Sequence, residues 1–138
     1  GGSAMPVTHE VIDKRLQYAF QDGQPVFKAA VKGMTSTMAE VLQRNNMTND
    51  DIDWVVPHQA NKRIIGAVTD FAGVNPEKVM VNIHKYGNTT AGTLPLCLWD
   101  YEKQLKRGDT LMLTAFGGGF TWGSILLKWS YDGLEFGV

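Results

Sequence analysis

The sequence VVPHQAN at residues 55–61 joins the end of an apolar segment to the start of a helical pattern. An apolar run that stops at a proline and is followed by polar residues is typical of a strand that leads directly into a helix. In sheets built from such units, ligands bind at the carboxyl ends of the strands, where helix N-termini also offer unpaired N–H groups. His58 therefore occupies a position at which a functional site is expected.

The same arrangement recurs in the next unit of the chain. The apolar segment VMVNI at residues 79–83 is followed by YGNTT at residues 86–90 and then by another helical pattern. Asn88 thus follows its strand much as His58 follows the preceding one. Because the carboxyl ends of neighbouring parallel strands lie at one edge of a sheet, we expect His58 and Asn88 to belong to one site.

The remaining segments extend this alternation over most of the chain. Apolar spacings of three and four residues predict helices that begin near Phe27, at Asn61 and between Asn88 and Gly92. The expected strands cover residues 16–20, 52–56, 79–83, 110–116 and 121–129. Strands that alternate with helices form parallel sheets, whereas two strands joined by a short glycine loop must be antiparallel. The sequence therefore predicts an α/β fold with a mixed five-stranded sheet, mostly parallel with an antiparallel last strand, and helices on its faces.

The helix predicted at residues 61–72 has a clear apolar face and a clear end. Its inner side is expected to carry Ile64, Ile65, Val68 and Phe71, which recur at helical spacing. Gly73 follows directly and is a typical C-terminal cap.

Length, composition and charge restrict the class of protein. The 138 residues fit one domain, and a net charge of −1 gives no electrostatic basis for binding nucleic acid or an anionic membrane. No apolar run approaches the ~20 residues that span a bilayer, and no signal peptide is visible. The single cysteine, Cys97, excludes an internal disulfide and fits a reducing compartment, so we expect a cytoplasmic protein. No Cys/His cluster has the spacing of a metal site.

The domain is expected to occupy residues 16–130. Residues 1–15 are polar and irregular, and the first five of them, GGSAM, look like a cloning scar. Residues 131–138 form a short tail that the pattern does not place.

Each candidate site residue also has a structural interpretation. A lone histidine after a strand is more often structural than catalytic, and Asn88 before two threonines is a good helix N-cap. The glycines at residues 117–119 fit a hairpin turn, although they also let backbone N–H groups approach a ligand, as an oxyanion hole requires. Cys97 stands among leucines in a helix and is expected to be buried rather than nucleophilic.

Three motifs together resemble one known family. PHQANKRII at residues 57–65, YGNTTA at residues 86–91 and AFGGGFTWG at residues 115–123 are similar to the C-terminal half of β-ketoacyl-[acyl-carrier-protein] synthase III, which has the thiolase-like fold. GQPVFK at residues 23–28 is similar to the segment that opens the first helix of that half. The resemblance covers roughly residues 16–129, in the order of the family and near its spacing.

The resemblance implies a condensation with decarboxylation. In this family an acyl group from acyl-CoA is carried on a cysteine, malonyl-acyl carrier protein is decarboxylated, and the resulting carbanion attacks the thioester. By resemblance, His58 and Asn88 donate hydrogen bonds to the malonyl thioester oxygen, and the Gly118 N–H serves a second oxyanion hole. Acyl-CoA and malonyl-carrier protein are substrates, no cofactor is implied, and the full-length enzyme is expected to be a homodimer that starts fatty acid biosynthesis.

The resemblance also implies where the two substrates lie. The residues that match the wall of the pantetheine/CoA channel are Gly23, Phe27, Ala60 and Asn61. Arg63 matches a basic position that engages the acidic carrier protein.

One part of the family's active site has no counterpart in this sequence. The nucleophilic cysteine belongs to the N-terminal half, and Cys97 does not match it. We therefore expect the chain to be inactive alone and to need that half as a partner.

Two other interpretations stay open at the level of sequence. The chain could come from a related type III condensing enzyme of secondary metabolism, which takes other acyl groups. It could also be a non-catalytic thiolase-fold module that only pairs with another subunit, since an isolated half would expose an apolar face.

Overall fold

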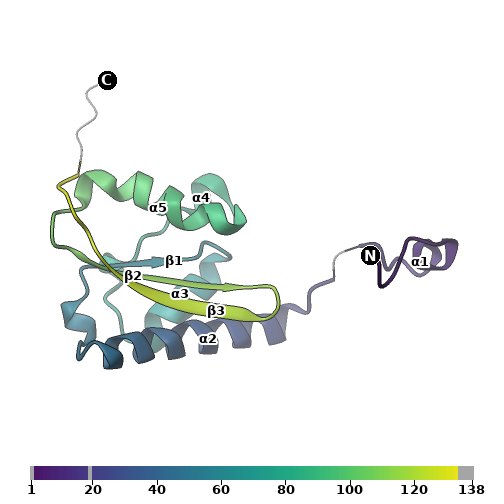
Figure 1. Ribbon diagram of the computed structural model, residues 1–138, viewed down its shortest axis with the longest axis horizontal. Helices are drawn as coiled ribbons and strands as arrows, with labels where there is room; N and C mark the ends of the chain where they lie inside the picture. The colour runs from purple at the N-terminus through teal and green to yellow at the C-terminus, as the bar shows by residue number, and fades with distance from the viewer. Residues whose placement is uncertain (1, 19, 134–138) are drawn as a thin grey trace, which may run out of the picture.

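The computed structural model describes residues 2–18 and 20–133, which form a sheet with helices on both faces (Figure 1). Helices α2 and α3 lie on one face, and α4 and α5 lie on the other (Figure 1). The α-helices are α1 (His9–Asp13), α2 (Gly23–Arg44), α3 (Lys62–Ala72), α4 (Ile83–Tyr86) and α5 (Thr93–Tyr101). Short 3-10 turns cover Asn49–Asp51, Pro76–Lys78, Thr90–Gly92 and Glu102–Gln104.

The sheet has three strands in the order β1 (Trp54–Pro57), β2 (Thr110–Gly117) and β3 (Thr121–Lys128). β1 runs parallel to β2, with Val56 opposite Leu113, and β2 and β3 form the predicted antiparallel hairpin. β1 and β2 therefore both end at the edge of the sheet where the hairpin turns (Figure 1).

Strand β1 and most of β2 are buried on both faces, which explains their almost continuous apolar sequences, whereas β3 is mostly exposed. Val55 and Met112 belong to the core under α2 and α3, whereas their neighbours Val56 and Leu111 belong to the core under α5. Val55 and Val56 lie on opposite faces of the sheet, as do Leu111 and Met112, because successive side chains of a strand point to opposite faces.

The long helix α2 follows the predicted periodicity. Its buried positions recur at intervals of one, three and four residues, and they include Ala30, Val31, Met34, Met38 and Leu42. This stripe faces the sheet and α3, so the helix is held by tertiary packing as well as by its own hydrogen bonds.

Helix α3 confirms the predicted ends but not the whole predicted face. Gly73 adopts a left-handed conformation (φ 65°) as the C-terminal cap. The expectation that Phe71 is buried is wrong, because its side chain is 78% exposed. Phe71 shares the stripe of Ile64, but it lies in the last turn of α3, where it borders a groove together with Met47 and its ring stays exposed.

Helix α5 starts late, at Thr93, after the 3-10 turn Thr90–Gly92. This confirms the later of the two expected starts, and Pro95 then lies in the first turn, where its missing N–H costs nothing. The helix ends at Tyr101, earlier than the predicted residue 106.

The prediction of five strands is wrong, because the described residues form three. The expected strand at residues 79–83 is reduced to one parallel bridge between Val79 and Val55. The backbone N–H groups of Asn82 and Ile83 are bound by the Gln59 side chain rather than by a neighbouring strand, and α4 begins at once.

The expected strand at residues 16–20 is also absent from the described part of that segment. Leu16 donates its backbone N–H to the carbonyl of Val11, 2.9 Å away, and this bond continues the turn that follows α1. Leu16 and Tyr18 are exposed, and residue 19 lies outside the described residues. Residues 1–15 were predicted to be irregular, yet they contain α1, which Thr8 caps by accepting the Val11 N–H.

The tail that the pattern did not place is described as far as Gly133. Tyr131 donates its hydroxyl to Glu102, 2.8 Å away, and Gly133 donates its N–H to the carbonyl of Leu105. Residues 134–138 lie outside the described residues. In the described part of the chain, no helix is long and apolar enough to cross a membrane.

Candidate active site

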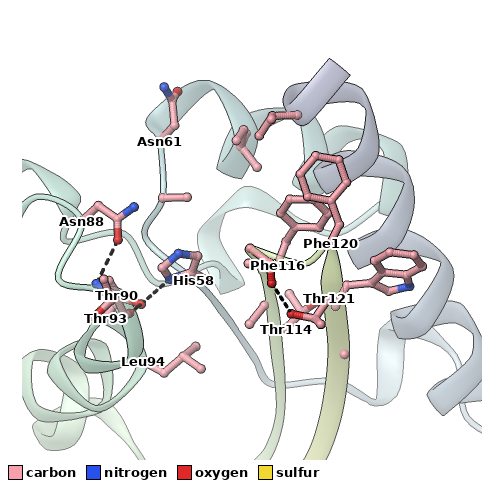
Figure 2. A pocket seen from close by; sticks show the side chains of 18 of the residues that line it. His58, Asn61, Asn88, Thr90, Thr93, Leu94, Thr114, Phe116, Phe120 and Thr121 are labelled. Atoms are coloured by element: carbon pink, nitrogen blue, oxygen red, sulfur yellow. Dashed lines mark hydrogen bonds between the residues drawn. The ribbon is translucent and has the colours of Figure 1, made fainter. Parts of the chain in front are cut away.

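A cleft of about 1090 Å³ opens where β1 and β2 end. Its walls come from the start of α2, the loop after β1, the loop before α5 and the β2–β3 turn (Figure 2). Every residue that the sequence assigned to a site lines this one cleft, namely Gly23, Phe27, His58, Ala60, Asn61, Arg63, Asn88 and Gly118.

His58 stands at the floor of the cleft, one residue beyond β1. Its backbone N–H donates to the carbonyl of Thr114, 2.8 Å away, so it is fixed to β2. Its ring atom Nδ1 lies 2.6 Å from the hydroxyl oxygen of Thr93 (Figure 2). Half-burial of the ring lowers the pKa of His58, because desolvation penalises the imidazolium. The neutral imidazole is therefore the favoured form.

Asn88 faces the same cleft from the loop between α4 and α5. Its side-chain oxygen accepts the backbone N–H of Thr90 at 2.9 Å, and its amide nitrogen points away from that bond (Figure 2). The turn-forming role and a donor role in the cleft are thus compatible within one side chain.

The turn that leads to Asn88 is held by Asp100 of α5. The Asp100 carboxylate accepts hydrogen bonds from Asn82 (3.1 Å), Lys85 (3.1 Å) and Tyr86 (3.0 Å). Burial alone would raise the pKa of Asp100, but these bonds outweigh it and lower the pKa. The carboxylate therefore stays ionised and fixes α4 against α5.

The glycine turn contributes the opposite side of the cleft. Gly118 lines it, and its carbonyl accepts the hydroxyl of Thr121 at 3.1 Å. Gly119 has φ 139°, and a side chain there would place its Cβ 2.9 Å from Thr121 Cγ2. The turn therefore requires glycine at residue 119.

The rim of the cleft carries its positive charge. The guanidinium carbon of Arg63 lies 5.7 Å from the centre of the Phe27 ring, within cation–π range. Asn61 caps α3 by accepting the Arg63 N–H at 2.8 Å. Among the described residues that line the cleft, Arg63 is the only Lys, Arg, Asp or Glu.

Several lining residues were not predicted as site residues. Phe116, Phe120 and Trp122 form an aromatic wall, with Phe116 5.1 Å from Phe120 and 6.3 Å from Trp122 between ring centres. Their place in the glycine-rich motif was the available signal. Thr93 also lines the cleft, but its spacing in the sequence gave no sign that it touches His58.

Comparison with known proteins agrees with this geometry. The family model described as 3-oxoacyl-[acyl-carrier-protein] synthase III C terminal matches residues 42–129. The β-ketoacyl-[acyl-carrier-protein] synthase III of Porphyromonas gingivalis is 58% identical over 133 residues, which are 96% of this chain and 40% of that protein. Synthase III 1 of Bacteroides thetaiotaomicron is 53% identical over 135 residues, covering 98% of this chain and 40% of that protein.

Solved structures show the same relationship. The synthase III of Pseudomonas aeruginosa superposes with a TM-score of 0.80 at 41% identity, covering 86% of this chain and 38% of that one. The synthase III of Aquifex aeolicus superposes with a TM-score of 0.79 at 42% identity, covering 83% of this chain and 38% of that one. The chain thus spans about 40% of the length of the curated relatives. The chain belongs to the 3-oxoacyl-[acyl-carrier-protein] synthase III family, corresponds to the C-terminal domain of these synthases and has their thiolase-like fold.

Proposed function

We propose that this chain forms the charge-stabilising wall of an active site that joins an acyl group from acyl-CoA to malonyl-acyl carrier protein with loss of CO₂. The observation that carries the proposal is that His58, which follows β1, and Asn88, from the loop between α4 and α5, line one cleft. Both are neutral side chains that can donate hydrogen bonds. The names of these two relatives, β-ketoacyl-[acyl-carrier-protein] synthase III and synthase III 1, support the same reaction.

The chemistry explains why neutral donors suit this place. Cleavage of the bond between the malonyl carboxylate and the α-carbon releases CO₂ and leaves the electron pair on that carbon, with negative charge spread to the thioester oxygen. Hydrogen bonds from His58 Nε2 and Asn88 Nδ2 stabilise that oxygen. A carboxylate in their place would repel it.

The carbanion then attacks the acyl thioester on a cysteine, and the thiolate leaves. Cys97 is not that cysteine, because it is fully buried and burial raises its pKa to about 12. The nucleophile comes from the N-terminal half of the full-length protein, so the isolated chain is inactive. The Gly118 N–H serves the oxyanion hole of this second step, and one such donor contributes about 2.7–4 kcal/mol to the transition state.

The rim residues bind the long substrate arms. Gly23, Phe27, Ala60 and Asn61 border the path of the pantetheine chain, and all four line the cleft. Arg63 is exposed at the rim, where it attracts the acidic surface of the carrier protein. The full-length enzyme acts as a cytoplasmic homodimer and uses acyl-CoA and malonyl-carrier protein as substrates without a further cofactor.

The test uses the full-length enzyme with His58→Ala. We expect the release of CO₂ from malonyl-carrier protein to fall about 10²–10³-fold, as for other single oxyanion donors, while acylation of the cysteine by acyl-CoA, followed by mass spectrometry, persists. His84→Ala is the matched control, since His84 is exposed and lies outside the residues that line the cleft. Undiminished decarboxylation by the His58 variant would refute the role of His58.

A further inference from the structure

Thr93 is a buried polar residue whose contacts the proposed reaction does not yet use. It is the first residue of α5 and is 1% exposed. Its hydroxyl oxygen lies 2.6 Å from His58 Nδ1 (Figure 2) and 3.0 Å from the backbone carbonyl oxygen of Thr90. A hydroxyl has one proton, so it can donate to only one of these two atoms at a time.

Two proton arrangements satisfy both contacts, and they give His58 opposite properties. If Thr93 donates to Nδ1, the neutral ring carries its proton on Nε2. If Thr93 donates to the Thr90 carbonyl, then Nδ1–H donates to Thr93, and Nε2 is left as an acceptor. Among the residues that the structure describes, Nε2 makes no hydrogen bond, so it is the nitrogen available to a ligand.

The partners of the Thr90 carbonyl favour donation from Thr93 to the ring. The Thr90 carbonyl already accepts the backbone N–H of Thr93, so it keeps a partner when the hydroxyl turns to His58. The short separation of 2.6 Å shows that the hydroxyl and Nδ1 share a hydrogen bond, whichever of them donates.

We propose that Thr93 is a positioning residue that donates its hydroxyl to His58 Nδ1 and thereby holds the proton of the neutral ring on Nε2, facing the cleft. The consequence for catalysis rests on the proposed function, because only this tautomer can donate a hydrogen bond to a thioester oxygen. The arrangement itself is a property of the chain and can be tested without substrate.

The first test is nuclear magnetic resonance of the ¹⁵N-labelled chain, whose three histidines give few ring signals. His9→Gln and His84→Gln assign the signals of His58. We expect the wild type and Thr93→Ser to show the pattern of a neutral ring protonated at Nε2. We expect Thr93→Val, which keeps the side-chain shape but has no hydroxyl, to shift toward the Nδ1–H pattern.

Two results of this measurement would overturn the inference: a wild-type ring protonated at Nδ1, or a Thr93→Val ring with the wild-type pattern. Thermal unfolding of each variant verifies that it is folded. If Thr93→Val does not fold, Thr93→Ser serves for the test, and a His58 ring protonated at Nδ1 in that variant would also count against the proposal.

The second test places the same variants in the full-length enzyme. Thr93→Val is expected to lower kcat for decarboxylation about tenfold with little change in KM, since it disorients one donor, whereas Thr93→Ser stays within about twofold. Failure here can be told apart from failure of the proposed function. An active His58→Ala enzyme refutes the role of His58, whereas an inactive His58→Ala enzyme with fully active Thr93→Val refutes only the role of Thr93.

Discussion

Gln59, beside the candidate catalytic histidine, provides the sharpest test of how the site is held in place. Its side chain is completely buried. The amide nitrogen donates to the carbonyl oxygens of Pro57 (2.8 Å) and Met80 (3.2 Å). The amide oxygen accepts the backbone N–H groups of Asn82 (3.0 Å) and Ile83 (3.1 Å). One amide therefore joins the end of β1 to the segment that leads into α4 and on to the loop of Asn88.

Gln59→Glu changes this network with almost no change in shape. The carboxylate keeps both acceptor bonds, but it loses both donor bonds and faces two carbonyl oxygens. Two buried carbonyls without their donor cost about 1–3 kcal/mol each, so we expect a loss of about 4 kcal/mol in the free energy of unfolding at pH 8. Domains of this size are stable by about 5–15 kcal/mol, so the variant retains at most a part of its stability.

The stability loss of Gln59→Glu should depend on pH, and this dependence distinguishes an effect of the buried charge from an effect of side-chain shape. Burial and the facing carbonyls raise the pKa of the introduced Glu in the folded state above its value of about 4.3 in the unfolded chain. Because the folded-state pKa of this Glu is raised, the Gln59→Glu variant keeps its stability below about pH 4.3, where the Glu is protonated. The variant loses stability as the pH rises through the folded-state pKa and the Glu becomes charged. The stability difference between Gln59→Glu and wild type should therefore shrink as the pH falls from 8 to 4.5.

Urea unfolding followed by tryptophan fluorescence, at several pH values, measures this difference. Gln17→Glu is the control, because Gln17 is exposed and the same substitution there should change stability by less than about 0.5 kcal/mol. A Gln59→Glu chain as stable as wild type at pH 8 would refute the importance of the network. An equal loss at every pH would show that the buried charge is not its cause.

Two further predictions concern the core. Cys97 is buried and its pKa is raised to about 12, so the folded chain should resist alkylation at pH 8 and react fully in denaturant; rapid modification of the native chain would contradict this burial. Gly33→Ala would place a Cβ 2.8 Å from Trp122 Cγ, so we expect it to destabilise by about 1–3 kcal/mol despite the better helix propensity of alanine. Gly66→Ala has no atom within 4 Å of the new Cβ, so it should instead stabilise the chain by up to about 1 kcal/mol. Thermal unfolding compares the two variants, and equal effects of Gly33→Ala and Gly66→Ala would refute the packing argument.

The sequence alone determined the features that depend on local chemistry. The apolar stripe of α2, the glycine cap at Gly73 and the glycine turn between β2 and β3 are set by residues close together in the chain, so periodicity and turn chemistry predicted them. The position of His58 at a strand end was predictable for the same reason.

Only the tertiary structure decided which groups pair across the chain. The segment at residues 79–83 reads as a strand, but it forms only one bridge because Gln59 binds the backbone N–H groups with which the segment would otherwise extend its pairing. Likewise, Thr93 meets His58 only because α5 packs over the end of β1. Apolar patterning specifies which face of a segment is buried, whereas a hydrogen-bond partner is specified only when the fold brings two distant segments together.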